Sequence, residues 1–352
     1  MLKKINSIKF FFFSIIIAYA YKLSLSYMSL CRNFLLNNRV IFLLSLILTF
    51  IVIEKIKMKK SKDRKSGVLK EFIHGSLAGF LGISIGKFGI SGDFSTYLTD
   101  KLYKYNISMN NFITFGYNLP ISGMVYSIED KKNFEKRSIV FKIILAAILS
   151  TLIHFLLLKH DYSGYLNVNF EKINIFALVS MIIFAEIYYF LFTFLLSNFE
   201  KIYQKINLNI LFLIVTILAL LFFPIITQSG FSQRDGLNDF KSIPILLAIF
   251  ILKLVYSVFS NTNNRIGGYF SPTIFLSFCM GLIFGKFFGI SNLFAISVMT
   301  VSLITLYTHK PIFAAFVGFE LYLKVNILEL LIIAIIIEYI NKKLVKLTQK
   351  NL

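Results

Sequence analysis

Long apolar runs, separated by short polar connections, follow one another along most of the chain. The first two runs, Ile8–Leu30 and Val40–Ile56, flank a short polar connection at Cys31–Arg39. Most runs approach the roughly 20 residues that an α-helix needs to cross a bilayer. We therefore predict an all-α, polytopic membrane protein. The later predicted membrane segments are Phe72–Ile90, Ile139–Leu158, Ile173–Leu196, Leu208–Ile226, Ile243–Phe259, Ser291–Leu306 and Ile327–Ile340.

The composition excludes an ordinary soluble domain. Of 352 residues, 57% are hydrophobic, with 40 Phe and no Trp. The net charge is +20, and a soluble protein this basic would suggest a nucleic-acid partner. Here most Lys and Arg stand in short connections between apolar runs, which is the distribution that orients membrane helices. We therefore predict a lipid bilayer as the surroundings and no nucleic-acid partner.

The charge distribution also predicts an orientation. The densest basic run is Lys55–Lys65, and the chain ends in the basic tail Asn341–Leu352. Basic connections stay on the cytoplasmic side, so both termini are predicted to be cytoplasmic in a multi-pass protein of the cell membrane. The segment Met1–Leu30 has the lysines and apolar run of a signal peptide but no small-residue cleavage site, so we interpret it as a retained helix.

Catalytic and metal-binding patterns are missing from the sequence. Cys31 and Cys279 are lone thiols in or near apolar segments, and a disulfide, metal site or nucleophile would each need partners that the sequence does not place. The four histidines form no cluster; they are His74, His154, His160 and His309. We predict no metal site, no cofactor and no enzymatic activity.

A glycine loop at Arg265–Pro272 precedes an apolar run that reaches Phe288. Gly267 and Gly268 permit positive φ and a close approach of backbone to ligand, and Pro272 suits a first helical turn. The free N–H groups of such a turn, together with the helix dipole, favour an anion. Irregular backbone at membrane depth lines a cavity or is buried in protein. We predict an anion-binding loop; on this stretch alone, a plain turn between membrane helices is the alternative.

Two parts of the chain repeat one pattern. Pro120 is followed nine residues later by Glu129, and Pro311 is followed nine residues later by Glu320. A glycine loop precedes each pair; these loops are Ile85–Gly89 and Ile266–Phe270. Internal repeats with interrupted helices at matching places are typical of transporters and channels whose site lies near the midplane.

These motifs resemble those of the chloride channel (CLC) family of channels and proton-coupled exchangers. Gly267–Pro272 is similar to the family's Gly-Gly-x-Phe-x-Pro loop, Asn118–Asp130 to its Asn-Ala-Pro helix, and His309–Glu320 to the matching helix of the second half. The resemblance covers the chain from Ser66 to the C-terminal tail and indicates a divergent, short, bacterial-type member. It implies an inverted repeat of tilted, partly re-entrant helices in a homodimer with one pore per subunit.

The resemblance also implies a division of the chain. Residues 1–65 would form N-terminal membrane helices and a basic cytoplasmic loop, followed by a first half at 66–200 and a second half at 201–345. Residues 346–352 would be a short cytoplasmic tail without a CBS domain.

By resemblance, a small anion such as chloride lies where helix N-termini meet. The implied anion-binding residues are Ser66, Gly86, Lys87, Phe88, Gly89, Gly268, Tyr269 and Phe270. Lys87 and Lys253 would raise the local potential for anions; pairing with Asp93, Glu129 or Glu320 is their structural alternative.

Departures from the family pattern carry the functional prediction. Phe88 stands where the family has its gating, proton-carrying glutamate, and Ile90 stands at the following proline. A phenylalanine carries no proton, so an open pathway would conduct passively and without proton coupling; alternatively Phe88 plugs it. Asp130 aligns with the inner proton-transfer glutamate of exchangers, and without a partner at Phe88 we interpret it as a remnant or a helix-end charge.

The family's tyrosine near the last helix has no counterpart around Leu344 and Val345, so the selectivity for chloride is inherited from the resemblance alone. The sequence therefore predicts passive, chloride channel-like conduction in a voltage-gated family. The alternatives are a chloride/proton antiporter and a non-conducting, degenerate paralogue with a structural role.

Overall fold

A computed structural model describes the helical parts of the chain, at residues 7–35, 38–56, 72–73, 76–77, 80, 102–129, 137–158, 174–205, 209–227, 237, 242–264, 270–322 and 325–350. All regular secondary structure within these ranges is helical, which confirms the all-α prediction. The elements are α1 (Ser7–Leu35), α2 (Arg39–Ile56), α5 (Leu102–Asn111), the π-helix η2 (Phe112–Gly116), α6 (Pro120–Glu129), α7 (Arg137–Leu158), α8 (Ile175–Lys205), α9 (Asn209–Phe222), the 3₁₀ turn η5 (Pro224–Ile226), α11 (Ile243–Asn264), α12 (Phe270–Phe288), α13 (Asn292–Thr308), α14 (Pro311–Leu321) and α15 (Ile327–Lys350).

Five of the described helices are long and apolar enough to cross a membrane, which agrees with the predicted multi-pass chain. They cover Ser7–Arg32, Arg137–Leu157, Ile175–Tyr203, Ile243–Asn261 and Phe270–Phe288. In the most apolar 18-residue stretch of α7, only 33% of the residues are buried inside the protein, whereas in that of α12 the share is 78%. Because an apolar face left uncovered by protein needs lipid, α7 lies at the rim of the protein and α12 in its interior.

Several helices extend beyond the predicted apolar runs. α1 continues to Leu35, so the connection to α2 is shorter than the predicted Cys31–Arg39. α8 continues to Lys205, and α15 continues to Lys350, well beyond the predicted end at Ile340. Hydropathy detects the part of a helix that suits lipid, whereas Lys, Glu and Gln continue the helix itself at little cost. In contrast, α9 ends at Phe222, shortly before Pro224, because proline cannot donate within a helix.

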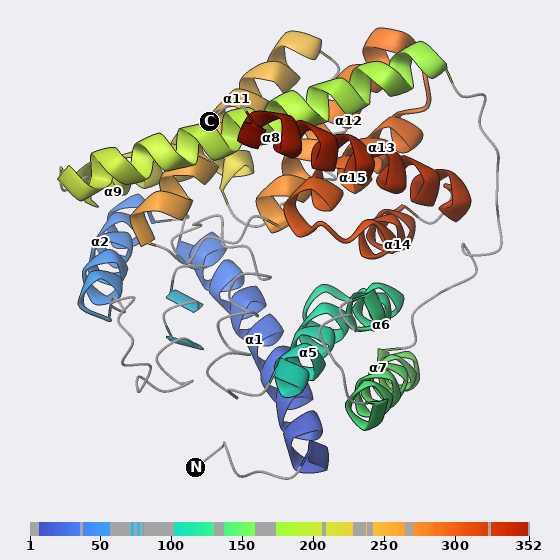
Figure 1. The fold of residues 1–352 in the computed structure, drawn as a ribbon. Coiled ribbons are helices and arrows are strands. Elements are labelled where there is room, and N and C mark those ends of the chain that lie inside the picture. The colour runs from blue at the N-terminus through green and yellow to red at the C-terminus, as the bar shows by residue number, and fades with distance from the viewer. Residues whose placement is uncertain are drawn as a thin grey trace.

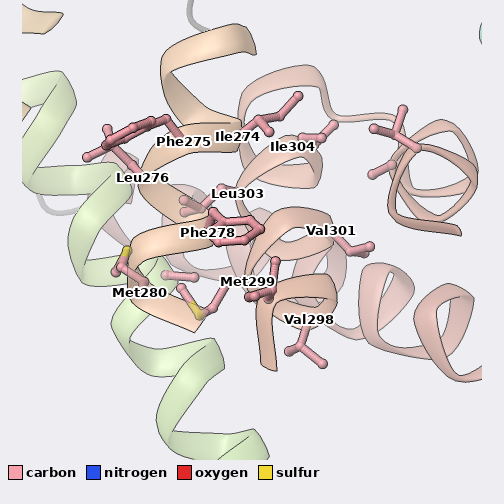
Figure 2. Close-up of a cluster of buried hydrophobic side chains, with 14 of the residues drawn as sticks. Ile274, Phe275, Leu276, Phe278, Met280, Val298, Met299, Val301, Leu303 and Ile304 are labelled. Atoms are coloured by element: carbon pink, nitrogen blue, oxygen red, sulfur yellow. The ribbon is translucent and has the colours of Figure 1, made fainter. Parts of the chain in front are cut away.

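The largest core surrounds the contact between α12 and α13, which pack more extensively than the other helix pairs. Figure 2 shows Phe278 and Met299 among the side chains that fill this contact. Gly281 faces the backbone of Ile296 so closely that an added Cβ would overlap the Ile296 Cα. Small residues allow membrane helices to approach in this way. Gly281 therefore serves the close packing of α12 against α13.

The two short helices α6 and α14, one in each predicted half, lie side by side in opposite directions. In Figure 1, α14 faces α6, with α5 and α7 on one side and α13 and α15 on the other. A residue in the left-handed conformation stands two positions before each proline: Asn118 has φ of 64° and His309 has φ of 53°. The sequence repeat around Pro120 and Pro311 is therefore an inverted structural repeat.

Candidate functional site

Phe270 is the one predicted anion-binding residue that falls within the described part of the chain. It is the first residue of α12 and is 5% exposed. The other predicted site residues lie outside the described residues: Ser66, Gly86, Lys87, Phe88, Gly89, Gly268, Tyr269 and the proton-transfer candidate Asp130. The candidate site is therefore built outward from the start of α12.

The first turn of α12 is buried, and it presents polar backbone N–H groups. Ser271 and Pro272 follow Phe270 directly, and all three side chains are buried. The initial N–H groups of a helix have no partner within the helix, and its dipole places partial positive charge there. The Ser271 hydroxyl is fully buried and has no hydrogen-bond partner among the described residues. This turn thus offers donors to a small anion inside the protein.

Aromatic rings connect the start of α12 to both repeats. The Phe270 ring meets the Tyr117 ring edge-on at a centroid distance of 5.0 Å, and it stacks on the Phe313 ring at 6.2 Å. Tyr117 follows the π-helix η2 and precedes α6, and Phe313 lies in the first turn of α14. Phe270 therefore stands where the first repeat, the second repeat and α12 come together.

The π-helix before α6 delivers Tyr117 to this contact. Its wider turn covers Phe112–Gly116, and the Tyr117 N–H donates to the Ile113 carbonyl. The Leu119 N–H donates to the same carbonyl at 3.4 Å. Such wide turns are rare and recur at functional sites. Here the wide turn ends α5 early enough for Asn118 to reverse the chain into α6.

The start of α6 is closed by a carboxylate from the other half of the chain. Glu320, at the end of α14, accepts hydrogen bonds from the backbone N–H groups of Ile121 at 2.8 Å and Ser122 at 2.7 Å. The Ser122 hydroxyl donates a further short bond to the same carboxylate. A carboxylate at a helix N-terminus satisfies the free donors and the dipole together.

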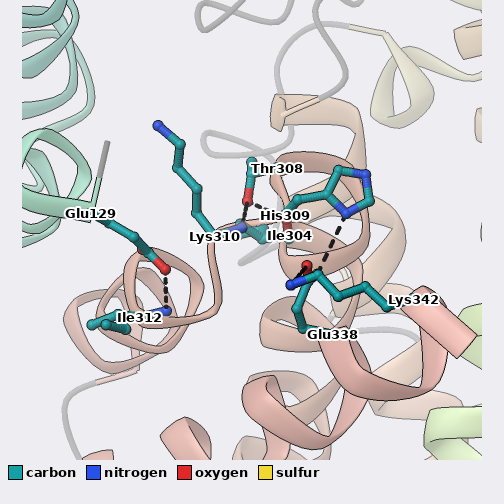
Figure 3. A network of polar contacts seen from close by, with 8 residues as sticks. All are labelled: Glu129, Ile304, Thr308, His309, Lys310, Ile312, Glu338 and Lys342. Atoms are coloured by element: carbon teal, nitrogen blue, oxygen red, sulfur yellow. Dashed lines mark hydrogen bonds and ion pairs between the residues drawn. The ribbon is translucent and has the colours of Figure 1, made fainter. Parts of the chain in front are cut away.

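The start of α14 is closed in the same way by the first half. Glu129, at the end of α6, accepts from the N–H groups of Ile312 at 3.2 Å and Phe313 at 2.8 Å. Figure 3 shows the Glu129 side chain directed at Ile312. Of the three helix starts near Phe270 that the structure describes, two are thus occupied by the protein's own carboxylates. The start of α12 is the one that carries a buried hydroxyl without a described partner.

Two lysines near this centre are held by carbonyl or ring contacts. Lys310, the residue before α14, places its Nζ 3.5 Å from the centre of the Tyr126 ring. Lys253 is fully buried in α11; its Nζ donates to the Ile226 carbonyl at 2.8 Å and lies 5.0 Å from the Phe275 ring centre. A cation over an aromatic face gains electrostatic stabilisation from the ring.

Sequence reasoning did not single out Ser271, Tyr117 or Phe313. Ser271 and Tyr117 stand inside the motifs that drew attention, Gly267–Pro272 and Asn118–Asp130, or directly beside them. A hydroxyl next to the loop and an aromatic before the reversal were therefore available signals. The contact with Phe313 could not be predicted in this way, because it joins segments that are far apart in the sequence. Within the described residues no group of three His, Cys, Asp or Glu side chains could hold a metal ion.

Comparison with known proteins gives a family match and a fold match. The protein-family model described as "Voltage gated chloride channel" matches residues 51–342. No match is found among curated protein sequences. A solved slow cyanobacterial Cl⁻/H⁺ antiporter has a TM-score of 0.71 at 13% identity, covering 95% of this chain and 92% of the antiporter. A CLC-type fluoride/proton antiporter has a TM-score of 0.69 at 14% identity, covering 96% and 94%. At such identities the two structures establish the fold.

Proposed function

The chain belongs to the family of voltage-gated chloride channels, and on this basis we propose that it conducts small anions, with chloride as the first candidate, passively down their gradient. The match spans most of the chain and agrees with the helical, multi-pass fold. The proposal has two parts, which separate experiments test: that an anion binds at the start of α12, and that its movement is not coupled to protons.

The observation that carries the proposal is the residue at position 88. Phe88 stands in Gly86–Gly89, at the place where the family resemblance puts a proton-carrying glutamate. General acid–base work needs a group that binds and releases a proton, and a phenyl ring has none. With Phe88 in the pathway, anion movement has no proton carrier at that step.

The start of α12 supports anion binding. Its first N–H groups, which have no acceptor within the helix itself, and the Ser271 hydroxyl are buried and stand where the two repeats meet at Phe270. The competing helix starts are neutralised by Glu129 and Glu320. Backbone donors with a fixed dipole bind an anion without placing a full positive charge in the membrane interior.

The first experiment measures anion and proton movement together. Purified protein in liposomes loaded with potassium chloride would receive valinomycin, with chloride efflux and external pH recorded at once. We expect chloride efflux without proton movement. Chloride efflux that drives protons would overturn the uncoupled mechanism and favour the antiporter alternative, in which Asp130 would be the remaining carboxylate. Folded protein without flux would favour the non-conducting alternative with Phe88 as a plug.

The second experiment tests the α12 start with a matched pair of variants. Ser271→Ala removes the buried hydroxyl, while Phe287→Ala alters a side chain near the other end of α12 that is 72% exposed. We expect chloride efflux to fall several-fold in Ser271→Ala and to stay within twofold in Phe287→Ala. Equal flux in both variants would remove Ser271 from the site.

The proposal extends to the assembly and to the arrangement in the cell membrane. We propose a homodimer with both termini cytoplasmic, with halves near 66–200 and 201–345; the reciprocal contacts of Glu129 and Glu320 support these halves. Cross-linking in membranes would show a dimer band that does not depend on dilution. Protease added to right-side-out vesicles should leave tags at both termini intact.

A further inference from the structure

One face of the last helix, α15, is exposed rather than packed against other helices. Its large apolar side chains recur at intervals of three and four residues, which is the spacing of a single helical face. Residues on the opposite face, such as Leu330 and Ile337, are fully buried. An exposed apolar face of this extent needs lipid or another protein against it. The exposed apolar residues of this face are Leu328, Ile332, Ile335 and Ile336.

The chemistry of the exposed face changes at Tyr339. This tyrosine is 58% exposed, and it follows the apolar stretch at the next helical turn. One turn further stand Lys342 and Lys343, whose side chains are exposed as well. In membrane helices tyrosine gathers at the level of the lipid headgroups, and a lysine near a helix end extends its ammonium group into the polar layer. The face therefore crosses from hydrocarbon to headgroups at Tyr339, and α15 continues beyond that level to Lys350.

Two contacts hold the ammonium groups of these lysines in place. The Lys342 Nζ lies 3.0 Å from the Glu338 Oε1, as Figure 3 shows. The Lys343 Nζ lies 4.7 Å from the centre of the Tyr339 ring. An ammonium group carries three N–H donors, so a contact with one carboxylate oxygen or one ring face leaves donors for a further acceptor. Because the side chains are ordered before a ligand arrives, binding costs less conformational entropy.

This end of α15 carries an excess of positive charge. Glu338 is the acidic side chain beside the two lysines, and it is only 6% exposed. One carboxylate against two ammonium groups leaves one positive charge in excess. The His309 ring, whose Nδ1 lies 3.4 Å from the Glu338 Oε2, adds a second when it is protonated. At the end of α8, in contrast, the exposed charges of the described residues, Glu200 and Lys201, cancel.

A lipid fits this surface better than a second protein does. Protein interfaces are depleted in lysine, whereas this face ends in two exposed lysines. A phospholipid matches the order of groups along the helix, with acyl chains against the isoleucines and a headgroup beside Tyr339. The headgroup has to be anionic to neutralise the excess charge, and lysines near the membrane surface attract anionic lipids. Its phosphate oxygens accept charge-assisted hydrogen bonds from ammonium groups.

We propose that Tyr339, Lys342 and Lys343 bind the headgroup of an anionic phospholipid. The two ammonium groups donate hydrogen bonds to the phosphate oxygens, and the Tyr339 ring lies at the level where the acyl chains begin. The acyl chains lie along Ile335 and Ile336. No residue of the candidate anion site takes part, so the lipid site stands whether or not the protein conducts anions.

Native mass spectrometry of the purified protein with equal amounts of phosphatidylglycerol and phosphatidylcholine tests the site. We expect the unchanged protein to retain phosphatidylglycerol preferentially. This preference should fall about fivefold or more in Lys342→Gln/Lys343→Gln, because each lysine near the surface contributes about fivefold in affinity. The matched control, Lys201→Gln/Lys286→Gln, removes two charges from α8 and α12 and should keep the preference. An equal preference in both variants would overturn the proposal. If Lys342→Gln/Lys343→Gln lost a dimer but kept its lipid preference, the face would join two copies, and the proposal would be wrong.

Thermal unfolding of Lys343→Gln supplies an independent readout. This variant leaves the contact between Lys342 and Glu338 in place, so a loss of folding does not obscure the result. A lipid that binds the folded state raises the Tm. We expect phosphatidylglycerol to raise the Tm of the unchanged protein and of Lys201→Gln more than phosphatidylcholine does. The difference between the two lipids should be smaller in Lys343→Gln, and smaller at high salt because salt screens surface charges. An unchanged difference in Lys343→Gln would contradict the lipid site.

Discussion

The short helices α6 and α14 use the same backbone device with different side chains. Each begins at a proline, two residues after a residue with positive φ, and each ends in a glutamate that closes the start of the other helix. In both cases the side chain of the residue with positive φ also contacts the next long helix along the chain. Asn118 forms a hydrogen bond with His154 on α7 at 2.8 Å, and His309 lies 3.4 Å from Glu338 on α15.

The differences between the two repeats begin at the second residue after each proline. Ser122 donates both its N–H and its hydroxyl to Glu320, whereas Phe313 donates only its N–H to Glu129 and turns its ring to Phe270. The next residue is Gly123 in α6 and Ala314 in α14. The first repeat thus has the larger number of hydrogen bonds at its helix start, and the second places an aromatic ring against the candidate site. The two repeats share the same backbone geometry, and they differ in the contacts that their side chains make.

The largest expected effect in this comparison is that of Glu320→Ala. It leaves the Ile121 and Ser122 donors without their partner, and hydrogen bonds to a charged group contribute about 1.5–3 kcal/mol each. We expect a loss of about 3 kcal/mol in the free energy of unfolding, measured by denaturant titration in mixed micelles. Glu200→Ala, at an exposed carboxylate on α8, is the control and should change it by less than about 0.5 kcal/mol. A loss no larger than that of the control variant would show that Glu320 does not stabilise the start of α6.

Glu129→Ala should cost less, about 2 kcal/mol. Its carboxylate accepts two backbone bonds, one of them at 3.2 Å to the exposed residue Ile312, where water replaces the lost acceptor in part. The same titration measures the difference between the two variants. If Glu129→Ala proved the more destabilising, the first repeat would not be the more strongly closed one.

Gly123→Ala sharpens the contrast at the fourth helical position. An added Cβ would overlap the Thr114 hydroxyl of the π-helix and lie 3.0 Å from the Asn110 carbonyl oxygen, and overpacking costs about 1–3 kcal/mol. We expect a loss of about 2 kcal/mol, partly recovered by adding Thr114→Ala. In the second repeat, Ala314→Gly should cost about 1 kcal/mol through helix propensity. Without recovery in the double variant, Thr114 would not be the obstructing group.

Ser122→Ala should have the smallest effect among the variants of the first repeat, a loss of about 1 kcal/mol. It removes one hydroxyl bond to Glu320 but leaves both backbone bonds in place. Combined with Glu320→Ala, the two losses should fall short of additivity because the hydroxyl then has no carboxylate to bind. Additive losses would show that Ser122 stabilises α6 by a route other than Glu320.

Much of the fold follows from patterns within single segments. The apolar run after Pro272 predicts α12 to its end at Phe288, and the run from Ile139 predicts α7 to within two residues. Helix formation and bilayer crossing depend on neighbours three and four residues apart and on local hydropathy. For the site, the sequence indicates Phe270 and the loop before it, because glycine, proline and a helix start are also local features.

The sequence by itself predicted an all-α, multi-pass membrane protein and the repeat of Pro and Glu at equal spacing. The tertiary structure decided what that repeat does: Glu129 and Glu320 each close a helix almost 200 residues away, at Phe313 and Ser122. The physical reason is that helix periodicity is set by neighbours along the chain. The partner of a buried charge, in contrast, is set by which helices pack together, and in this protein those helices come from distant parts of the sequence.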